Sequence, residues 1–193
     1  VRLDGVTSFI ITGSGDTETV IGTAGVDTIA ASNGVSIIGG KGSDKIELST
    51  TGSVNSVVYS STTDGTDKVT NFRNGSDRVV ISGDLLSAVT RGGVFVVNNE
   101  SHDGVSNVDS VAVLSDTVEI GNLSGDGGIG KFISALGTLV SGSTSSSLLV
   151  VAHDQNSNSG LFLITEGKTN KVSGGQVKLL AFFQETILST ASI

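Results

Sequence analysis

The chain has 193 residues, a formal net charge of −8 and 27 glycines, but no proline, cysteine, methionine or tryptophan. The lack of cysteine excludes a disulfide framework and any thiolate metal site, and the negative charge argues against nucleic acid or an anionic membrane as a partner, since both bind basic faces. Without proline, turns must be made by Gly, Asn, Asp and Ser, and with abundant Val, Ile, Ser and Thr this predicts many short strands.

Residues 1–82 contain short apolar segments separated by turns rich in Gly and Asp. Ordinary strands average about five or six residues, and these segments are shorter. Strands this brief between glycine corners predict a coil with one strand per half-turn, which is the geometry of a parallel β-roll or β-helix. The segments lie at 8–13, 19–22, 27–31, 36–40, 44–48, 56–60, 67–72 and 77–83.

From residue 83 onward the predicted strands are longer and alternate apolar with polar residues. They lie at 92–99, 110–116, 147–154, 160–167 and 175–183. Residues 129–140, IGKFISALGTLV, instead repeat apolar residues at a period of 3.6 and predict a short helix. The predicted fold is therefore all-β, with a parallel β-roll or β-helix in 1–82 that continues into a β-rich C-terminal cap, 83–193, carrying one short helix.

A nonapeptide repeat supplies the candidate binding site. Residues 39–47, GGKGSDKIE, fit the pattern G-G-x-G-x-D-x-U-x at every specified position, and residues 22–30, GTAGVDTIA, fit it with Thr23 in place of the second glycine. Stacked corners of this kind would surround a cation with carbonyl and carboxylate oxygens, which suits Ca²⁺. The candidate ligand residues are Gly22, Gly25, Asp27, Gly39, Gly40, Gly42 and Asp44, with Asp64, Asp67 and Asp77 as further candidates.

The alternative is that these corners are plain glycine turns with no metal, and it has most force for Asp64, Asp67 and Asp77, because Asp and Gly also serve ordinary turns. In either case period-two alternation in the strands after the corners predicts that Ile29 and Ile46 are buried. Lys45 and Glu47 should then face solvent.

These residues resemble the RTX (repeats-in-toxin) β-roll proteins, which bacteria export by type I secretion and which include toxins, proteases, lipases and S-layer proteins. Residues 56–82 resemble the segment that follows the repeats in this family, with its G-x-D-x-I-x-x-F core present as Gly65, Asp67, Val69 and Phe72. Residues 159–183 are similar to a C-terminal strand pair of S-layer-like members, and the apolar, hydroxyl-rich tail is similar to a type I secretion signal.

Three other patterns suggest chemistry that we do not expect. Residues 154–160, DQNSNSG, begin like an EF-hand loop, but the glycine is seventh instead of sixth, so a polar hairpin loop is favoured over a second cation site. Residues 125–131, GDGGIGK, match a P-loop, yet Phe132 stands where Mg²⁺ needs Ser or Thr. His102 and His153 are expected to be exposed turn residues, and nothing in the sequence indicates catalysis.

The resemblance implies a non-enzymatic, calcium-binding C-terminal region of an exported bacterial surface protein of the S-layer-like kind. Such a chain stays loose in the low-calcium cytosol, passes the type I secretion apparatus, and folds outside the cell when calcium binds. Besides calcium, the implied partners are neighbouring copies of the protein or a cell-surface glycan. No nucleic acid partner and no transmembrane segment are expected.

Three alternatives remain open at the level of sequence. The chain is the C-terminal secretion domain of an exported hydrolase, or the terminal module of a large RTX adhesin, or a structural spacer that binds no calcium. Because the chain starts at Val1 and contains no methionine, we expect it to be a fragment of a longer protein.

Overall fold

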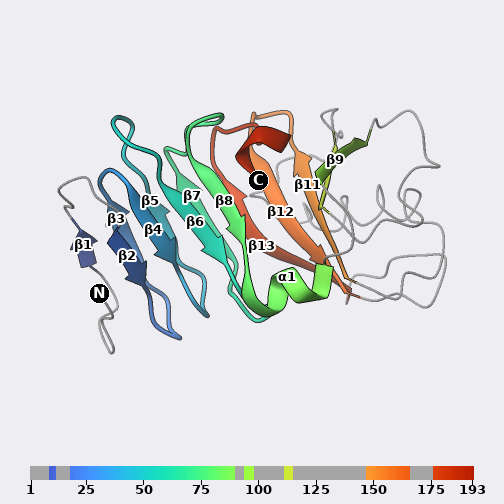
Figure 1. Cartoon of the computed structure of the whole chain (residues 1–193), viewed down its shortest axis with the longest axis horizontal. Coiled ribbons are helices and arrows are strands. Elements are labelled where there is room, and N and C mark those ends of the chain that lie inside the picture. Colours follow the sequence, from blue (N-terminus) through green and yellow to red (C-terminus); the bar gives the residue numbers. More distant parts are fainter. Residues whose placement is uncertain (1–8, 12–17, 90–93, 98–110, 115–146, 166–175) are drawn as a thin grey trace.

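The computed structural model describes residues 9–11, 18–89, 94–97, 111–114, 147–165 and 176–193. These residues form two β-sheets with one short α-helix, so the prediction of a mostly β fold is confirmed (Figure 1). That helix, α1 (Gly83–Val89), was not predicted, and the predicted helix at 129–140 lies outside the described residues. Within the described ranges, no helix is long and apolar enough to cross a membrane.

The first eight strands alternate between the two sheets. The odd-numbered strands lie in the larger sheet and the even-numbered strands form the smaller one, and neighbours within each sheet are parallel. Each strand coincides with a segment predicted from the sequence. They are β1 (Phe9–Ile11), β2 (Glu18–Ile21), β3 (Thr28–Ala31), β4 (Val35–Ile38), β5 (Lys45–Glu47), β6 (Ser56–Tyr59), β7 (Asp67–Thr70) and β8 (Arg78–Ile81).

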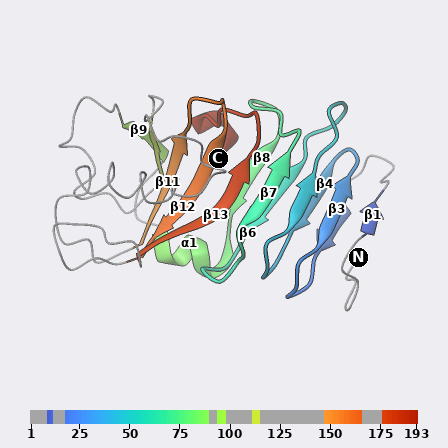
Figure 2. The same ribbon diagram turned by 180° about the vertical axis from the view of Figure 1, so that it is seen from behind.

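The larger sheet continues into the C-terminal part of the chain. The last strand, β13, pairs in parallel with β7, and β12 and β11 follow it in antiparallel order (Figure 2). Two further strands, β10 and β9, pair in parallel beyond β11. All five coincide with predicted strands, and their bounds are β9 (Val94–Val97), β10 (Val111–Leu114), β11 (Leu148–His153), β12 (Ser159–Ile164) and β13 (Val177–Phe183).

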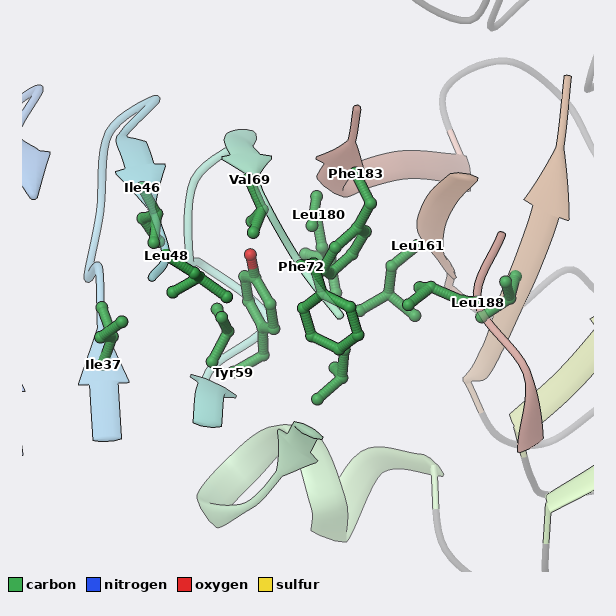
Figure 3. Close-up of a cluster of buried hydrophobic side chains, with 14 of the residues drawn as sticks. Ile37, Ile46, Leu48, Tyr59, Val69, Phe72, Leu161, Leu180, Phe183 and Leu188 are labelled. Atoms are coloured by element: carbon green, nitrogen blue, oxygen red, sulfur yellow. The ribbon is translucent and has the colours of Figure 1, made fainter. Parts of the chain in front are cut away.

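The core lies between the two sheets because alternate residues of each strand point inward. In β5, Ile46 is buried while Lys45 and Glu47 are exposed, as the alternation predicts, and Ile29 is buried in β3. Figure 3 shows Tyr59 in this core with its hydroxyl oxygen directed toward β7, the strand that carries Val69.

One apolar core extends through both parts of the chain. Leu161, Leu180 and Phe183 from the C-terminal strands belong to the same cluster of buried side chains as Ile37 and Val57. The rings of Phe72 and Phe183 meet edge to face with their centroids 5.1 Å apart. Helix α1 adds Leu85 and Val89 to this core.

Candidate metal centre

Three corners of the coil lie one above another at the same edge. Each connects a strand of the smaller sheet to the next strand of the larger one, at residues 22–27, 39–44 and 62–67. Strand pairing fixes their register, since Thr28 is paired with Lys45 and Lys45 with Lys68. We call these three corners the aspartate edge. It brings together nine of the ten candidate residues named from the sequence, and Asp77 is the exception.

The sixth residues of these corners, Asp27, Asp44 and Asp67, form a ladder. The backbone N–H of Asp27 donates to Asp44 Oδ1 at 2.8 Å, and the N–H of Asp44 donates to Asp67 Oδ1 at 3.0 Å. The backbone continues the ladder, because Lys45 N–H donates to the carbonyl of Asp27 and Lys68 N–H to that of Asp44. The spacing of 17 residues between the first two aspartates is therefore a structural register, although the intervening unit is one residue short of two nonapeptides.

The corner glycines are needed because the carbonyl oxygens of one corner lie against the backbone of the next. A Cβ on Gly40, Gly42 or Gly65 would collide with the carbonyl oxygen of Thr23, Gly25 or Gly42, respectively. Gly40 and Gly42 also have φ of 94° and 116°, a region that favours glycine. The glycine cluster in residues 39–42 thus lets stacked corners approach closely while turning their carbonyl oxygens along the stack.

Two other carboxylates, those of Asp27 in the first corner and Asp64 in the third, are held by donors close to them in the chain. Thr23, which replaces the second glycine of the repeat, donates its backbone N–H to Asp27 Oδ2 at 2.6 Å and its hydroxyl to the same oxygen at 3.0 Å. Asp64 Oδ2 accepts the backbone N–H groups of Ser60 and Ser61 at 2.7 and 2.9 Å. These hydrogen bonds fix the shape of the first and third corners.

Asp44, in the middle corner, has an oxygen with no donor. Its side chain is 1% exposed, and Oδ2 has no hydrogen-bond partner among the described residues. A Cβ on Gly39 would lie 2.6 Å from this oxygen and 3.2 Å from Asp67 Oδ2, so both carboxylates face the same space beside Gly39. A buried carboxylate oxygen without a partner is costly, and a cation or a proton relieves the cost.

Burial and the neighbouring negative charges raise the pKa values of Asp44 and Asp67. Burial, together with the charges of Asp27 and Asp64, raises the pKa of Asp44 to about 6, although its hydrogen bond from Asp27 works in the other direction. Burial and the charges of Asp44 and Asp64 raise the pKa of Asp67 to about 7. The buried Tyr59 also has a raised pKa, through burial and the charge of Asp67. Without a cation, Asp44 and Asp67 therefore keep their protons to a higher pH than ordinary aspartates do.

The residues of the aspartate edge fit a calcium ion better than a metal bound by side chains alone. Among the described residues, no group of three or more Asp, Glu, His or Cys side chains is arranged to hold a metal ion. Calcium takes six to eight oxygen ligands and accepts backbone carbonyls among them. The corners offer both kinds of oxygen, because a Cβ on Gly22 would meet the carbonyl oxygen of Gly39 and Asp27 Oδ2, and one on Gly39 would meet the carboxylates of Asp44 and Asp67.

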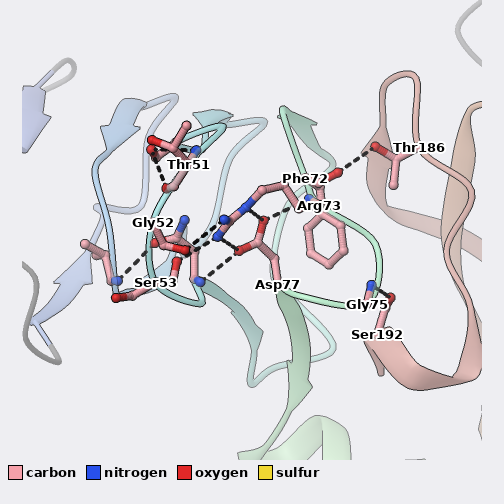
Figure 4. Close-up of polar contacts among 12 residues, drawn as sticks. Thr51, Gly52, Ser53, Phe72, Arg73, Gly75, Asp77, Thr186 and Ser192 are labelled. Atoms are coloured by element: carbon pink, nitrogen blue, oxygen red, sulfur yellow. Dashed lines mark hydrogen bonds and ion pairs between the residues drawn. The ribbon is translucent and has the colours of Figure 1, made fainter.

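Asp77, the tenth candidate, lies at the opposite edge of the coil, in the turn from β7 to β8. Its Oδ1 accepts the backbone N–H of Asn55 at 2.9 Å, and it pairs with the guanidinium of Arg73 at 2.8 Å (Figure 4). Arg73 also donates to the carbonyl oxygens of Gly52 and Ser53 at 2.9 and 2.7 Å. The side chain of Arg73 therefore supplies the positive charge at this edge.

Sequence reasoning missed two residues of this second edge, Asn55 and Arg73. Asn55 repeats the ladder of the aspartate edge, because its Oδ1 accepts the backbone N–H of Val35 at 3.1 Å and its own N–H donates to Asp77, 22 residues further on. A search for Asn as well as Asp at the repeat spacing could have found it. Arg73 gives no such signal, since one arginine in a polar turn resembles any solvated residue.

The loop that begins like an EF-hand is a polar hairpin, as predicted. Residues 154–158 connect the antiparallel strands β11 and β12. Asp154 Oδ1 accepts the backbone N–H groups of Asn156 and Asn158, both at 2.9 Å, and Oδ2 accepts from Asn158 Nδ2, also at 2.9 Å. The carboxylate is thus used to close the loop.

The prediction that His153 is an exposed turn residue is wrong. It lies in β11, is 3% exposed, and has a pKa lowered by burial. Its Nδ1 lies 2.8 Å from Ser159 Oγ, which also donates to the carbonyl of Thr186 at 2.6 Å and accepts the N–H of Leu188 at 2.9 Å. Ser159 is fully buried and fixes the C-terminal segment through these bonds. His102 and the P-loop-like residues 125–131 lie outside the described residues.

A polar groove of about 430 Å³ lies on the outer face of the larger sheet. Two of its lining residues, Asn71 and Glu185, have positive φ of 61° and 52°, which is uncommon for residues other than glycine. Its full lining comprises Lys45, Glu47, Lys68, Thr70, Asn71, Phe72, Gln184, Glu185 and Thr186.

Comparison with known proteins adds no family. No protein-family model, curated protein or solved structure matches the chain.

Proposed function

We propose that residues 1–82 form a calcium-binding parallel β-roll, within the non-catalytic C-terminal region of an exported bacterial surface protein. The observation that carries the proposal is the buried Oδ2 of Asp44, which has no donor and faces the same space as the carboxylate of Asp67. The alternation of the first eight strands between two sheets, with parallel neighbours in each, supports the β-roll, because each corner then stacks directly on the next.

The mechanism follows from the charge of the aspartate edge. Asp27, Asp44, Asp64 and Asp67 are each at most 5% exposed, so folding without a cation buries repelling carboxylates. Calcium removes this cost only in the folded chain, since the unfolded chain does not hold the carbonyl and carboxylate oxygens together. In low calcium the chain would stay loose enough for export, and millimolar calcium outside the cell would drive folding.

The assignment to a surface protein of the S-layer-like kind rests on the resemblance of the repeats and of the C-terminal strands to RTX proteins. The non-enzymatic role is part of what the same resemblance implies. If the chain is instead the secretion domain of an exported hydrolase, the catalytic residues would lie in sequence that precedes Val1.

A second candidate function, the terminal module of an adhesin, is favoured by the polar groove. Lys45, Lys68, Glu47 and Glu185 line it with charges of both signs, next to the amide of Gln184. Such a surface offers donors and acceptors to a hydroxyl-rich ligand such as a glycan. Binding of the folded chain to an immobilised surface glycan, abolished by Glu185→Ala with calcium affinity unchanged, would favour the adhesin.

The calcium proposal can be tested directly because Tyr59 is the sole tyrosine and the chain has no tryptophan. Tb³⁺ takes the same oxygen ligands as Ca²⁺, and energy transfer from Tyr59 would make it luminesce when bound near Asp67. We expect luminescence that calcium displaces, together with a thermal melt by circular dichroism that rises strongly with calcium relative to chelator. No sensitised luminescence and identical melts would overturn the proposal.

A further inference from the structure

The third corner of the aspartate edge can be aligned with the first two by strand register. Thr28, Lys45 and Lys68 are level with one another in the larger sheet. In each corner, the first residue lies six positions before the paired strand residue, and the third residue lies four positions before it. The first residues are Gly22, Gly39 and Thr62, and the third residues are Ala24, Lys41 and Asp64.

Lys178, from β13, contacts these same two levels of the third corner. Its ammonium Nζ donates to the carbonyl oxygen of Thr62 at 3.0 Å and to the carbonyl oxygen of Asp64. The parallel pairing of Ala181 with Asp67 brings the N-terminal half of β13 beside the third corner. The ammonium therefore sits at the C-terminal end of the stack, on carbonyls equivalent to those of the nonapeptide corners.

The surroundings of Lys178 match those of a bound cation. Burial lowers its pKa, while the charges of Asp64 and Asp67 act in the opposite direction and favour the charged ammonium. Asp64 and Asp67 are 5% and 2% exposed. Converging carbonyl oxygens beside two buried carboxylates are also the oxygen ligands that calcium accepts.

At the opposite edge of the coil, a side-chain cation is likewise bound by backbone carbonyl oxygens. There the guanidinium of Arg73 lies on the carbonyl oxygens of Gly52 and Ser53 and on the carboxylate of Asp77 (Figure 4). The chain thus supplies its own cation at two corners, once from strand β13 and once from the turn between β7 and β8, with different side chains. This recurrence indicates that a side-chain cation can do at a corner what a metal ion would do.

We propose that Lys178 is the terminal cation of the aspartate edge, occupying the position where a further divalent cation would otherwise bind against residues 62–67. This inference rests on the proposed function, because it assumes that the preceding corners bind calcium. Lys178 then ends the metal-binding stack and ties the C-terminal sheet to it through the carbonyls of Thr62 and Asp64.

The test is a count of bound calcium in Lys178→Met, which removes the charge while keeping an unbranched side chain. We expect equilibrium dialysis at saturating calcium to give one more calcium ion per chain than the parent binds. Lys68→Met is the matched control, because Lys68 lies on the neighbouring strand with an exposed side chain and should leave the count unchanged. Lys178→Arg keeps a cation and should also leave it unchanged.

Each outcome decides the proposal. A parent that binds calcium and a folded Lys178→Met with the same count would overturn the role of Lys178 and leave the proposed function intact. A parent that binds no calcium would overturn both. If Lys178→Met does not fold, Lys178→Gln is counted in its place, and failure of both to fold at saturating calcium would show that a metal ion cannot replace the ammonium.

Discussion

The two oxygens of the Asp44 carboxylate lie in different surroundings. Oδ1 accepts the backbone N–H of Asp27 at 2.8 Å and so belongs to the ladder that joins the corners. Oδ2 has no partner among the described residues and faces the space beside Gly39. An asparagine keeps an acceptor for the ladder and removes the charge, so substitution can separate the two roles.

We predict that Asp44→Asn loses its response to calcium without losing its fold. In chelator the variant should be within about 1 kcal/mol of the parent or more stable, because a buried charge without a donor is gone. At a calcium concentration about 100-fold above Kd it should lack about 2.7 kcal/mol of stabilisation from the lost site. Denaturant unfolding followed by circular dichroism, with calcium and with chelator, measures both.

The matched control is Asp77→Asn at the opposite edge. Asp77 is fully buried and pairs with Arg73, so this variant should lose about 1–3 kcal/mol through the weakened ion pair. The loss should be equal with and without calcium, because Arg73 already supplies the cation there. If Asp44→Asn and Asp77→Asn respond alike to calcium, the two edges do not differ in the way proposed.

The raised pKa values of Asp44 and Asp67 predict how stability depends on pH when calcium is removed. In the folded chain these groups keep their protons up to about pH 6 and about pH 7, whereas in the unfolded chain both ionise near 3.8. Between these values the folded state binds more protons than the unfolded state, so the free energy of unfolding falls as the pH rises. The chelated protein should therefore melt at a lower temperature at about pH 8 than at about pH 5.

Calcium should remove or reverse this trend, because a bound cation favours the ionised carboxylates. Melting curves across the same pH range with calcium and with chelator make the comparison. A chelated protein whose melting temperature rises steadily from about pH 5 to about pH 8 would contradict the crowding of these carboxylates.

At the scale of the elements, the close stacking of the corners predicts which glycines can be replaced and which cannot. A Cβ on Gly65 would collide with the carbonyl of Gly42, whereas among the described residues a Cβ on Gly25 would meet only Thr23 Oγ1, at an ordinary 3.7 Å. We predict that Gly65→Ala loses about 3 kcal/mol, at the upper end for over-packing, while Gly25→Ala is tolerated. Both are read from denaturant unfolding in calcium, and equal losses would contradict the stacking.

The strands were predictable because each is a short apolar segment between glycine corners, and alternation alone identified Ile46 as buried between Lys45 and Glu47. The aspartate edge was predictable for the same reason, since residues 22–27 and 39–44 share one local pattern. Helix α1 was not, because a segment as short as residues 83–89 has too little periodicity to identify, and its burial depends on tertiary packing.

The contacts that join distant parts of the chain were also beyond the sequence. Lys178 meets Thr62 and Asp64 only because β13 pairs with β7, more than a hundred residues away. His153 was misread because a histidine next to an aspartate looks like a turn, while its burial in β11 follows from the pairing with β12. Local sequence patterns predict where the strands lie, whereas pairing across the sheet determines which polar residues are buried.

At the scale of the whole molecule, the corners of the aspartate edge and the C-terminal strands share one sheet and one core. β13 is hydrogen-bonded to β7, and Gln184 N–H continues this pairing to the carbonyl of Val69 at 2.9 Å. Phe72 packs edge to face on Phe183 across the same junction. Unfolding of the first eight strands would therefore expose the edge of β13 and half of the aromatic pair.

We predict from this continuity that the chain unfolds in calcium as one cooperative unit. This is expected although the sequence changes near residue 82 from short segments between glycine corners to longer strands. Scanning calorimetry should give a single transition whose calorimetric and van't Hoff enthalpies agree. Calcium bound at the aspartate edge should then shift the whole transition, including the C-terminal strands that hold no predicted ligand. Two transitions, of which calcium moves only one, would instead mean that residues 1–82 and 83–193 fold separately and that the β7–β13 pairing contributes little to stability.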